Sequence, residues 1–340
     1  MGLLEYLHRV AGGQSLTEQQ AFNAMKAILQ GEASTAQIAA FLVALRMKGE
    51  TVAELVGFAR AMREMATRIE VDAGGEPLLD TCGTGGDNAG TFNISTIAAF
   101  VAAGAGVRVA KHGNRSISSA CGSADLMDRL GIRLVLDPAD LARALREIGI
   151  AFLFAPALHP AMRHAQPARL ELKMRTVFNL LGPLANPAGA NVQIVGAPSA
   201  DVARLLAEAL ARLGLEHGFV VHGTDGLDEI TTTGRTLLIE VERGAVREAT
   251  ISPQDFGVPA ARREDLRGGD ADANARIARD ILAGVHGPRR DVVLVNAAAA
   301  LVAAGKAATF REGMALAASA IDSGAARRKL EALAAFCGQA

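Results

Sequence analysis

Residues 80–87 read Asp-Thr-Cys-Gly-Thr-Gly-Gly-Asp, and a short polar loop then leads into Thr91-Phe92-Asn93-Ile94-Ser95-Thr96. A strand-like apolar run over 77–82 ends at the glycines, and a helix-like run over 95–105 follows the loop. Glycines allow several backbone N–H groups to point at one ligand, and the N-terminus of the next helix adds a partial positive charge. The stretch therefore predicts a phosphate-binding turn between a strand and a helix.

The glycine spacing alone leaves a second interpretation open, an ordinary tight turn. It matches neither the GxGxxG turn of dinucleotide-binding folds nor the P-loop, which needs Lys-Ser or Lys-Thr after its second glycine. Asp87 is an acceptor, and a carboxylate beside a phosphate site indicates a cation or a sugar hydroxyl nearby. The remaining motifs have to decide between the two interpretations.

The composition limits the class of protein. The chain has 340 residues, enough for two domains, and its net charge of −1 argues against a nucleic-acid-binding surface. Three cysteines, Cys82, Cys121 and Cys337, have no spacing typical of a metal site or a disulfide framework. Since neither a signal peptide nor an uncharged apolar run of membrane-spanning length is evident, we expect a cytoplasmic protein with no membrane partner.

The chain divides into a helical part and an α/β part. Over 1–72 the pattern is helical, with capping boxes predicted at 15–18, 34–37 and 51–54. A hinge is predicted near 71–76, and an α/β domain over 77–340. Its alternating strands and helices favour a mostly parallel central sheet covered on both faces. Proline-rich residues 157–187 interrupt the alternation, and we expect part of this crossing to pack on the helical domain.

The expected elements of the α/β domain follow the apolar periods. Strands are predicted at 78–82, 107–110, 151–155, 192–196 and 218–221, with an antiparallel hairpin of 237–242 and 245–250. Helices are predicted at 95–105, 124–130, 138–148, 201–213, 274–284, 292–304 and 311–324, with a last helix ending at 336.

Four polar clusters lie at strand ends or in the crossing, where ligands of open α/β sheets bind. They are the glycine loop with its helix start; residues 111–119, which contain two cations, a histidine and hydroxyls; Arg169, Arg175 and Asn179; and residues 222–229, which contain adjacent Asp228 and Glu229. Taken singly, the second cluster also fits a solvated loop and the fourth an acidic turn. Together they predict a ligand with pyrophosphate and sugar parts and a Mg²⁺ site. No Ser-His-Asp set or activated cysteine is evident, so the expected chemistry is positioning and charge neutralisation of a leaving group.

These motifs resemble the anthranilate phosphoribosyltransferase family. The resemblance rests on residues 37–51, 80–96, 111–119, 122–125, 175–187 and 223–229 and covers the chain in order. It implies a nucleoside-phosphorylase-like, class IV phosphoribosyltransferase fold and a homodimer formed through the helical domain. The implied reaction joins anthranilate to phosphoribosyl pyrophosphate (PRPP) with Mg²⁺, the second step from chorismate to tryptophan.

The resemblance also implies roles for individual residues. Lys111, His112 and Arg169 are expected to be catalytic, and Ser95, Asp228 and Glu229 to hold Mg²⁺. Anthranilate is expected to contact Gly83, Asn114 and Arg169, with Arg169 on its carboxylate. The residues expected to bind PRPP are Gly83, Gly86, Asp87, Thr91, Asn93, Ile94, Ser95, Thr96, Lys111, His112, Gly113, Asn114, Arg115, Ser116, Ile117, Ser118, Ser119 and Ser123.

Two other functions stay open at this point. A pyrimidine nucleoside phosphorylase would share the fold, but its glycine loop and lysine signature differ, and Asp228 and Glu229 would have no role in it. A silent paralogue that binds nucleic acid predicts a basic surface and eroded motifs, whereas this chain is nearly neutral and its motifs are intact.

Overall fold

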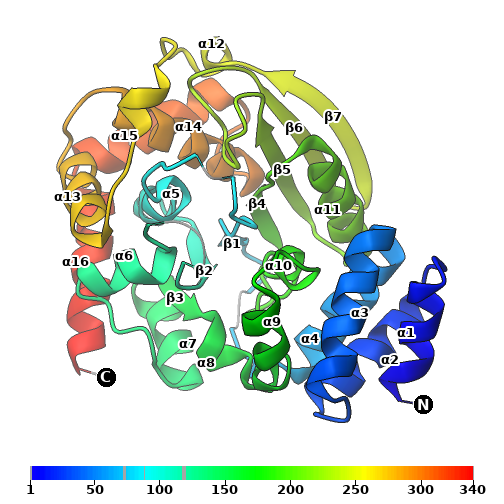
Figure 1. Ribbon diagram of the computed structural model, residues 1–340. Helices are drawn as coiled ribbons and strands as arrows, with labels where there is room; N and C mark the ends of the chain where they lie inside the picture. Colours follow the sequence, from blue (N-terminus) through cyan, green and yellow to red (C-terminus); the bar gives the residue numbers. More distant parts are fainter. Residues whose placement is uncertain (1, 72–73, 88, 117–119, 340) are drawn as a thin grey trace.

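The computed structural model describes residues 2–71, 74–87, 89–116 and 120–339, so part of the predicted hinge lies outside the described residues. A small N-terminal helical domain and a larger α/β domain make up the fold (Figure 1). The helical domain contains α1 (Leu3–Ala11), α2 (Glu18–Leu29), α3 (Thr35–Lys48) and α4 (Val52–Met65). This arrangement confirms the predicted fold class; the domain boundaries at 72 and 77 stay a prediction.

Reciprocal side-chain caps start three of these helices. Ser34 and Thr51 cap α3 and α4 as predicted. The hydroxyl of each accepts a hydrogen bond from the backbone N–H of the third helical residue, and the side chain of that residue accepts one from the N–H of the cap residue. The prediction for α2 was wrong by two residues. Thr17, not Ser15, is the N-cap, and Gln20 completes the box.

The central sheet has seven strands in the order β3-β2-β1-β4-β5-β6-β7. The first five strands in this order, β3, β2, β1, β4 and β5, are parallel to one another. Strands β6 and β7 form the predicted antiparallel hairpin at one edge. The strands are β1 (Leu78–Asp80), β2 (Arg108–Gly113), β3 (Ile150–Phe154), β4 (Val192–Gly196), β5 (His217–Gly223), β6 (Thr236–Glu242) and β7 (Ala245–Ile251).

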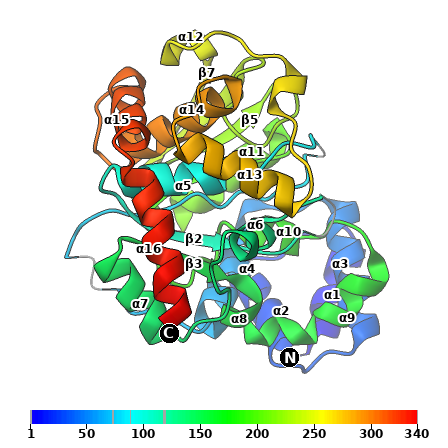
Figure 2. The same cartoon turned by 90° about the vertical axis from the view of Figure 1, so that its left-hand side faces the viewer.

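Helices cover both faces of this sheet. On one face lie α5 (Ile94–Gly104), α14 (Pro288–Ala303) and α16 (Ala325–Gln339), which Figure 2 shows in front of the strands. On the other, α11 (Ala200–Arg212) packs against β5 and β6 and also contacts α4. The remaining helices are α6 (Ser123–Arg129), α7 (Pro138–Glu147), α12 (Pro253–Phe256), η2 (Arg263–Leu266), α13 (Ala271–Leu282) and α15 (Phe310–Asp322).

The crossing is more helical than the sequence predicts. It contains α8 (Ala155–Leu158), η1 (Pro160–His164), α9 (Gln166–Leu172) and α10 (Phe178–Leu181). These helices were not predicted, because they are too short to show a helical period and prolines interrupt the sequence around them. Buried side chains of α9 and α10 share one apolar cluster with the helical domain and with α11.

The topology places the ligand site. From β1 the chain adds β2 and β3 on one side of β1, and then returns to add β4 on the other. The strand order therefore reverses between β1 and β4, and a crevice opens there outside their carboxyl ends. The glycine loop leaves β1 at this point. No helix in the described part of the chain has the length and apolar character needed to cross a membrane.

Candidate active site

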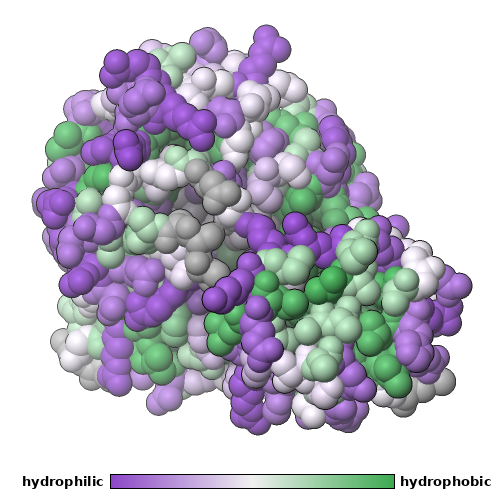
Figure 3. Space-filling view, in the orientation of Figure 1, coloured by the Kyte–Doolittle hydropathy of each residue, from purple (hydrophilic) through white to green (hydrophobic). Residues whose placement is uncertain are grey.

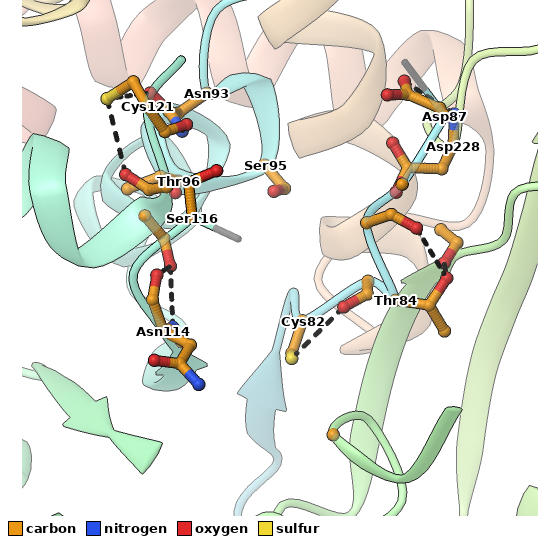
Figure 4. Close-up of a pocket in the computed structure, with 18 of the residues that line it drawn as sticks. Cys82, Thr84, Asp87, Asn93, Ser95, Thr96, Asn114, Ser116, Cys121 and Asp228 are labelled. Atoms are coloured by element: carbon orange, nitrogen blue, oxygen red, sulfur yellow. Dashed lines mark hydrogen bonds between the residues drawn. The ribbon is translucent and has the colours of Figure 1, made fainter. Parts of the chain in front are cut away.

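A cavity of about 670 Å³ opens at the carboxyl ends of β1, β2 and β4. All the site residues predicted above line it, apart from Ile117, Ser118 and Ser119, which lie outside the described residues. Figure 4 shows two walls that face one another across the cavity. Asn93, Thr96, Asn114, Ser116 and Cys121 form one wall, and Cys82, Thr84, Asp87 and Asp228 form the other.

Close backbone packing builds the second wall. Thr84 N donates to the carbonyl of Gly196 at 3.0 Å, and a Cβ at Gly83 would lie 3.2 Å from the Gly196 backbone. A Cβ at Gly196 would in turn lie 1.6 Å from the carbonyl oxygen of Asp228. The glycine loop, the end of β4 and the acidic loop can therefore stack only because both positions lack a side chain. Gly196 was not predicted as part of the site.

The N-terminus of α5 opens toward the first wall. Asn93 is its N-cap residue, yet its side chain makes no capping bond. Instead, Asn93 Nδ2 donates to the Cys121 carbonyl at 3.0 Å, and Oδ1 accepts from Asn274 Nδ2 at 3.0 Å. Ser95 and Thr96 follow in the first turn. In the first turn, Ser95 N donates to the Glu229 carboxylate at 3.0 Å. The partial positive charge of this helix end favours negatively charged groups at the cavity.

Lys111 and His112 belong to a strand, not to the loop predicted for them. Strand β2 continues to Gly113 because residues 109–113 pair with β3. Lys111 is buried, and its Nζ donates to the Thr81 carbonyl at 2.8 Å. Burial raises the pKa of neighbouring Asp80 to about 6, while the charge of Lys111 opposes that shift. The strand thus presents a buried cation at the cavity floor.

His112 is a neutral imidazole with one free nitrogen. Burial lowers its pKa to about 4. Nδ1 lies 3.1 Å from the Gly182 carbonyl, so Nδ1 carries the proton, and Nε2 is buried without a hydrogen-bond partner among the described residues. That lone pair can accept a hydrogen bond from a ligand.

The loop after β2 folds back on the start of α6. Asn114 N donates to Ser123 Oγ at 3.2 Å, and Asp125 accepts from the backbone of Ser116 and Gly122. The Arg115 guanidinium pairs with Asp125 at 2.7 Å. These bonds hold Asn114, Arg115 and Ser116 at the rim of the cavity.

Three carboxylates, Asp87, Asp228 and Glu229, converge on the second wall. Asp228 N donates to Asp87 Oδ2 at 3.4 Å, and Ser95 N donates to Glu229 Oε1 at 3.0 Å. Burial, together with the charges of Asp87 and Glu229, raises the pKa of Asp228 well above its usual value. Burial also raises the pKa of Glu229 to about 7. A cation would relieve this repulsion, and the hard oxygen donors fit Mg²⁺.

A second group of potential metal ligands is less suited to an ion. Donor atoms of Asp80, Cys82 and His112 lie within 4.8 Å of one another, a proximity that the cysteine spacing did not predict. However, both oxygens of Asp80 accept hydrogen bonds, from His112 N and Asn186 Nδ2, and the charge of Lys111 acts on the same carboxylate. Burial raises the pKa of Cys82 to about 12, so it stays a thiol at neutral pH.

The crossing supplies the third side of the cavity. The Arg169 guanidinium lies over the Phe178 ring at 5.2 Å, and burial lowers its pKa. Asn179 is committed to the backbone, because its Oδ1 accepts from Thr176 N at 2.9 Å. Arg175 reaches the glycine loop.

One part of the cavity was missed from the sequence. Arg267, Gly268 and Gly269 line it from the loop between η2 and α13. Gly268 N donates to the Gly90 carbonyl at 3.0 Å, and Thr91 forms a β-bridge with Arg267. The available signal was the glycine pair directly before Asp270, the residue that caps α13.

Comparisons with known proteins agree with this geometry. The model of the "Glycosyl transferase family, a/b domain" matches residues 75–327, and that of the "Glycosyl transferase family, helical bundle domain" matches residues 4–66. The anthranilate phosphoribosyltransferase of Solibacter usitatus is 65% identical over 99% of both chains. The chain belongs to the anthranilate phosphoribosyltransferase family. The family member from Moorella thermoacetica is 55% identical over 97% of each chain.

Solved structures of anthranilate phosphoribosyltransferases share the whole fold. The Thermus thermophilus enzyme superposes with a TM-score of 0.92 at 45% identity, covering 98% of this chain and 99% of the other. The Saccharomyces cerevisiae enzyme, solved in complex with PRPP and Mg, has a TM-score of 0.91 at 28% identity, with 99% and 98% covered.

Proposed function

We propose that this chain transfers the phosphoribosyl group of PRPP to the amine of anthranilate. The products are N-(5-phosphoribosyl)anthranilate and pyrophosphate, and the reaction is the second step from chorismate in tryptophan biosynthesis. The observation that carries the proposal is the cavity at the β1–β4 reversal, which combines a glycine loop, a helix N-terminus, a buried lysine and a carboxylate cluster. The chain that forms it is 65% identical to an anthranilate phosphoribosyltransferase. This family membership displaces the nucleoside phosphorylase and nucleic-acid alternatives. The cytoplasmic location stays a prediction.

PRPP occupies the space between the two walls in this proposal. Gly83, Gly86 and the N-terminus of α5 offer backbone N–H groups to its phosphates. Lys111 supplies a buried positive charge beside them. Asn114, Arg115 and Ser123 hold the ribose and phosphate oxygens from the rim. Residues 117–119, which lie outside the described residues, keep the same expected role.

The carboxylate cluster is proposed to hold Mg²⁺ through Asp228, Glu229 and Ser95. The support is electrostatic, because Asp228 and Glu229 face each other and Asp87 with raised pKa values. When bound, the ion would neutralise charge on the pyrophosphate. The relative solved with PRPP and Mg supports this choice of metal.

Anthranilate is proposed to bind between Gly83, Asn114 and the crossing. Arg169 is oriented by its contact with the Phe178 ring, so its planar guanidinium can pair with a carboxylate. The free Nε2 of His112 can accept a hydrogen bond from the amine. Because the pKa of His112 is lowered to about 4, the imidazole stays neutral at pH 7 and Nε2 keeps its lone pair for an N–H of the amine.

These residues support substitution at ribose C1 without a strong base. Backbone N–H groups of the glycine loop and Lys111 stabilise negative charge as the C1–oxygen bond to pyrophosphate breaks. The aromatic amine is already a free base at neutral pH, so its lone pair forms the new C1–N bond from the opposite face with inversion. The acidic ammonium nitrogen that results then releases its proton to water or to the departing pyrophosphate. Closure between the helical and the α/β domain would exclude water and limit PRPP hydrolysis.

We also propose that two copies of the chain pair through the helical domain. Leu4, Met47, Leu170 and Met174 are exposed large apolar side chains on α1, α3 and α9 or just after α9, and Met47 is 83% exposed. Figure 3 shows hydrophobic atoms gathered where α3 and α9 lie in Figure 1. An apolar surface of this kind favours association.

A direct assay tests the proposed reaction. The protein is mixed with PRPP, Mg²⁺ and anthranilate, and the loss of anthranilate fluorescence is followed. We expect turnover that needs all three components. No turnover here, with turnover of uridine and phosphate instead, would overturn the assignment.

A further inference from the structure

Arg175 spans the cavity from the crossing to the glycine loop. It lies in the segment between α9 and α10, and it lines the cavity together with Gly86. A Cβ placed on Gly86 would lie 1.1 Å from Arg175 Nη1, so the guanidinium fills the space that any side chain at 86 would need. Gly86 also has a φ of 84°, a backbone conformation that residues with a side chain rarely adopt, so both the space and the backbone require glycine here.

Both negative and positive side chains lie near the Arg175 guanidinium. Burial lowers the pKa of Arg175, while the charges of Asp228 and Asp87 raise it and that of Arg46 lowers it. Arg175 Nη2 is buried and has no hydrogen-bond partner among the described residues. A buried guanidinium N–H without an acceptor is costly, so an acceptor brought by a ligand would stabilise this arrangement.

The backbone of Arg175 is fixed independently of its side chain. Arg46 Nη1, from α3 of the helical domain, donates to the Arg175 carbonyl at 3.0 Å. Next along the chain, Asn179 Oδ1 accepts from Thr176 N. Arg175 is thus pre-positioned at the cavity, with its guanidinium packed against Gly86 of the glycine loop.

We propose that Arg175 binds the diphosphate of PRPP from the crossing side, its guanidinium donating to a phosphate oxygen beside the glycine loop. The proposal rests on the proposed function, because it assigns the diphosphate end of the substrate to this part of the cavity. A planar fork suits phosphate oxygens better than an ammonium group does, so lysine substitutes only in part. Arg175 also contributes positive charge opposite Asp87 and Asp228 when the diphosphate arrives.

Calorimetric titration with inorganic pyrophosphate in the presence of Mg²⁺ tests the role without turnover. We expect Arg175→Gln to weaken pyrophosphate binding by about 10- to 100-fold, in line with loss of a charged hydrogen bond. Arg175→Lys is expected to recover part of the affinity. Arg163→Ala is the matched control, since it removes a cation from an exposed position of the same crossing that does not line the cavity; it is expected to bind like wild type.

Steady-state kinetics separate the alternatives. The KM for PRPP is expected to rise in Arg175→Gln, and the KM for anthranilate to change little. Wild-type pyrophosphate affinity in Arg175→Gln overturns the proposal, and so does a raised KM for anthranilate alone. If Arg175→Gln does not fold, judged by its Tm, Arg175→Lys decides on the same criteria. Because pyrophosphate binding needs no anthranilate, wild type could bind it tightly and still fail the transfer assay, which would overturn the proposed function only.

Discussion

Asn186 donates from Nδ2 to Oδ2 of Asp80 at 2.7 Å and, from the same nitrogen, to the Ala110 carbonyl at 2.9 Å. Both side chains are buried, and Asp80 Oδ1 accepts from His112 N at 3.1 Å. The contact joins the crossing to the carboxyl ends of β1 and β2. Asp80 therefore aligns the strand that carries Lys111 and His112.

Replacing Asp80 tests this alignment. Asp80→Asn turns an amide donor toward the donor of Asn186 and removes the carboxylate beside Lys111. We expect the free energy of unfolding to fall by about 2–4 kcal/mol and kcat to fall with it. Denaturant unfolding measures the first effect. In a double-mutant cycle with Asn186→Ala, the two changes together are expected to cost less than the sum of the single effects; additive effects would argue against the contact.

The carboxylate pair makes a prediction about metal dependence. Asp228→Ala and Glu229→Ala are each expected to raise the Mg²⁺ concentration needed for half-maximal PRPP use at least about tenfold, because each removes a hard oxygen ligand. Activity is measured across a Mg²⁺ titration, and Mn²⁺ binding is followed by electron paramagnetic resonance. Asp225→Asn is the control in the same loop, since Asp225 accepts from Thr231 Oγ1 at 2.7 Å and supports the loop instead. Unchanged metal dependence in both alanine variants would remove the assignment.

Arg169 makes a prediction about the aromatic substrate. Arg169→Ala is expected to raise the KM for anthranilate by about 10- to 100-fold, and the KM for PRPP far less, because a charged hydrogen bond to the carboxylate is lost. Arg169→Lys keeps the charge without the fork and is expected to be intermediate. Initial rates at varied concentrations of each substrate give both constants. Equal increases in the two KM values would contradict a carboxylate contact.

Helices and strands can be predicted from the sequence wherever hydrophobic residues recur with a local period. Features that depend on contacts between residues far apart in the sequence cannot be predicted in this way. Strand β4 has the predicted bounds of 192–196, because a short apolar run ends at Gly196. The polar Lys111 and His112 concealed the end of β2, since pairing with β3 extends the strand past them. The Asp80–Asn186 contact spans 106 positions, and no local pattern reports it. Site residues were predicted because their motifs are contiguous, whereas Gly196 and Arg267 stand outside those motifs.

The apolar surface of the helical domain makes a prediction about assembly. Met47→Lys combined with Leu170→Lys is expected to convert a dimer to a monomer, because two charges would face apolar side chains in the interface. Analytical ultracentrifugation measures the molecular mass. Leu316→Lys, at an exposed position on α15, is the control and is expected to leave the mass unchanged. A wild-type chain that sediments as a monomer would contradict pairing through this surface.

Acid stability depends on His159, which lies beside His112 with ring centroids 5.2 Å apart. Burial lowers the pKa of His159 to about 3, from 6.5, and a proton on neighbouring His112 would lower it further. Between these two values the unfolded chain binds a proton that the native state does not, so the free energy of unfolding decreases as the pH falls through 6.5. For His159 alone the loss at pH 5 relative to pH 8 is about 2 kcal/mol.

His159→Gln removes this titration while keeping a donor for the Ala185 carbonyl, which accepts a hydrogen bond from the ring. The variant is expected to be less stable than wild type at pH 8, because it loses ring packing, and the difference is expected to narrow by about 2 kcal/mol at pH 5. Urea unfolding at both pH values measures it, with His8→Gln at an exposed position of α1 as the control. If the free energy of unfolding changed equally with pH in wild type and His159→Gln, His159 would take up its proton in the native state as well. The assignment of His159 as a neutral, buried histidine would then be wrong.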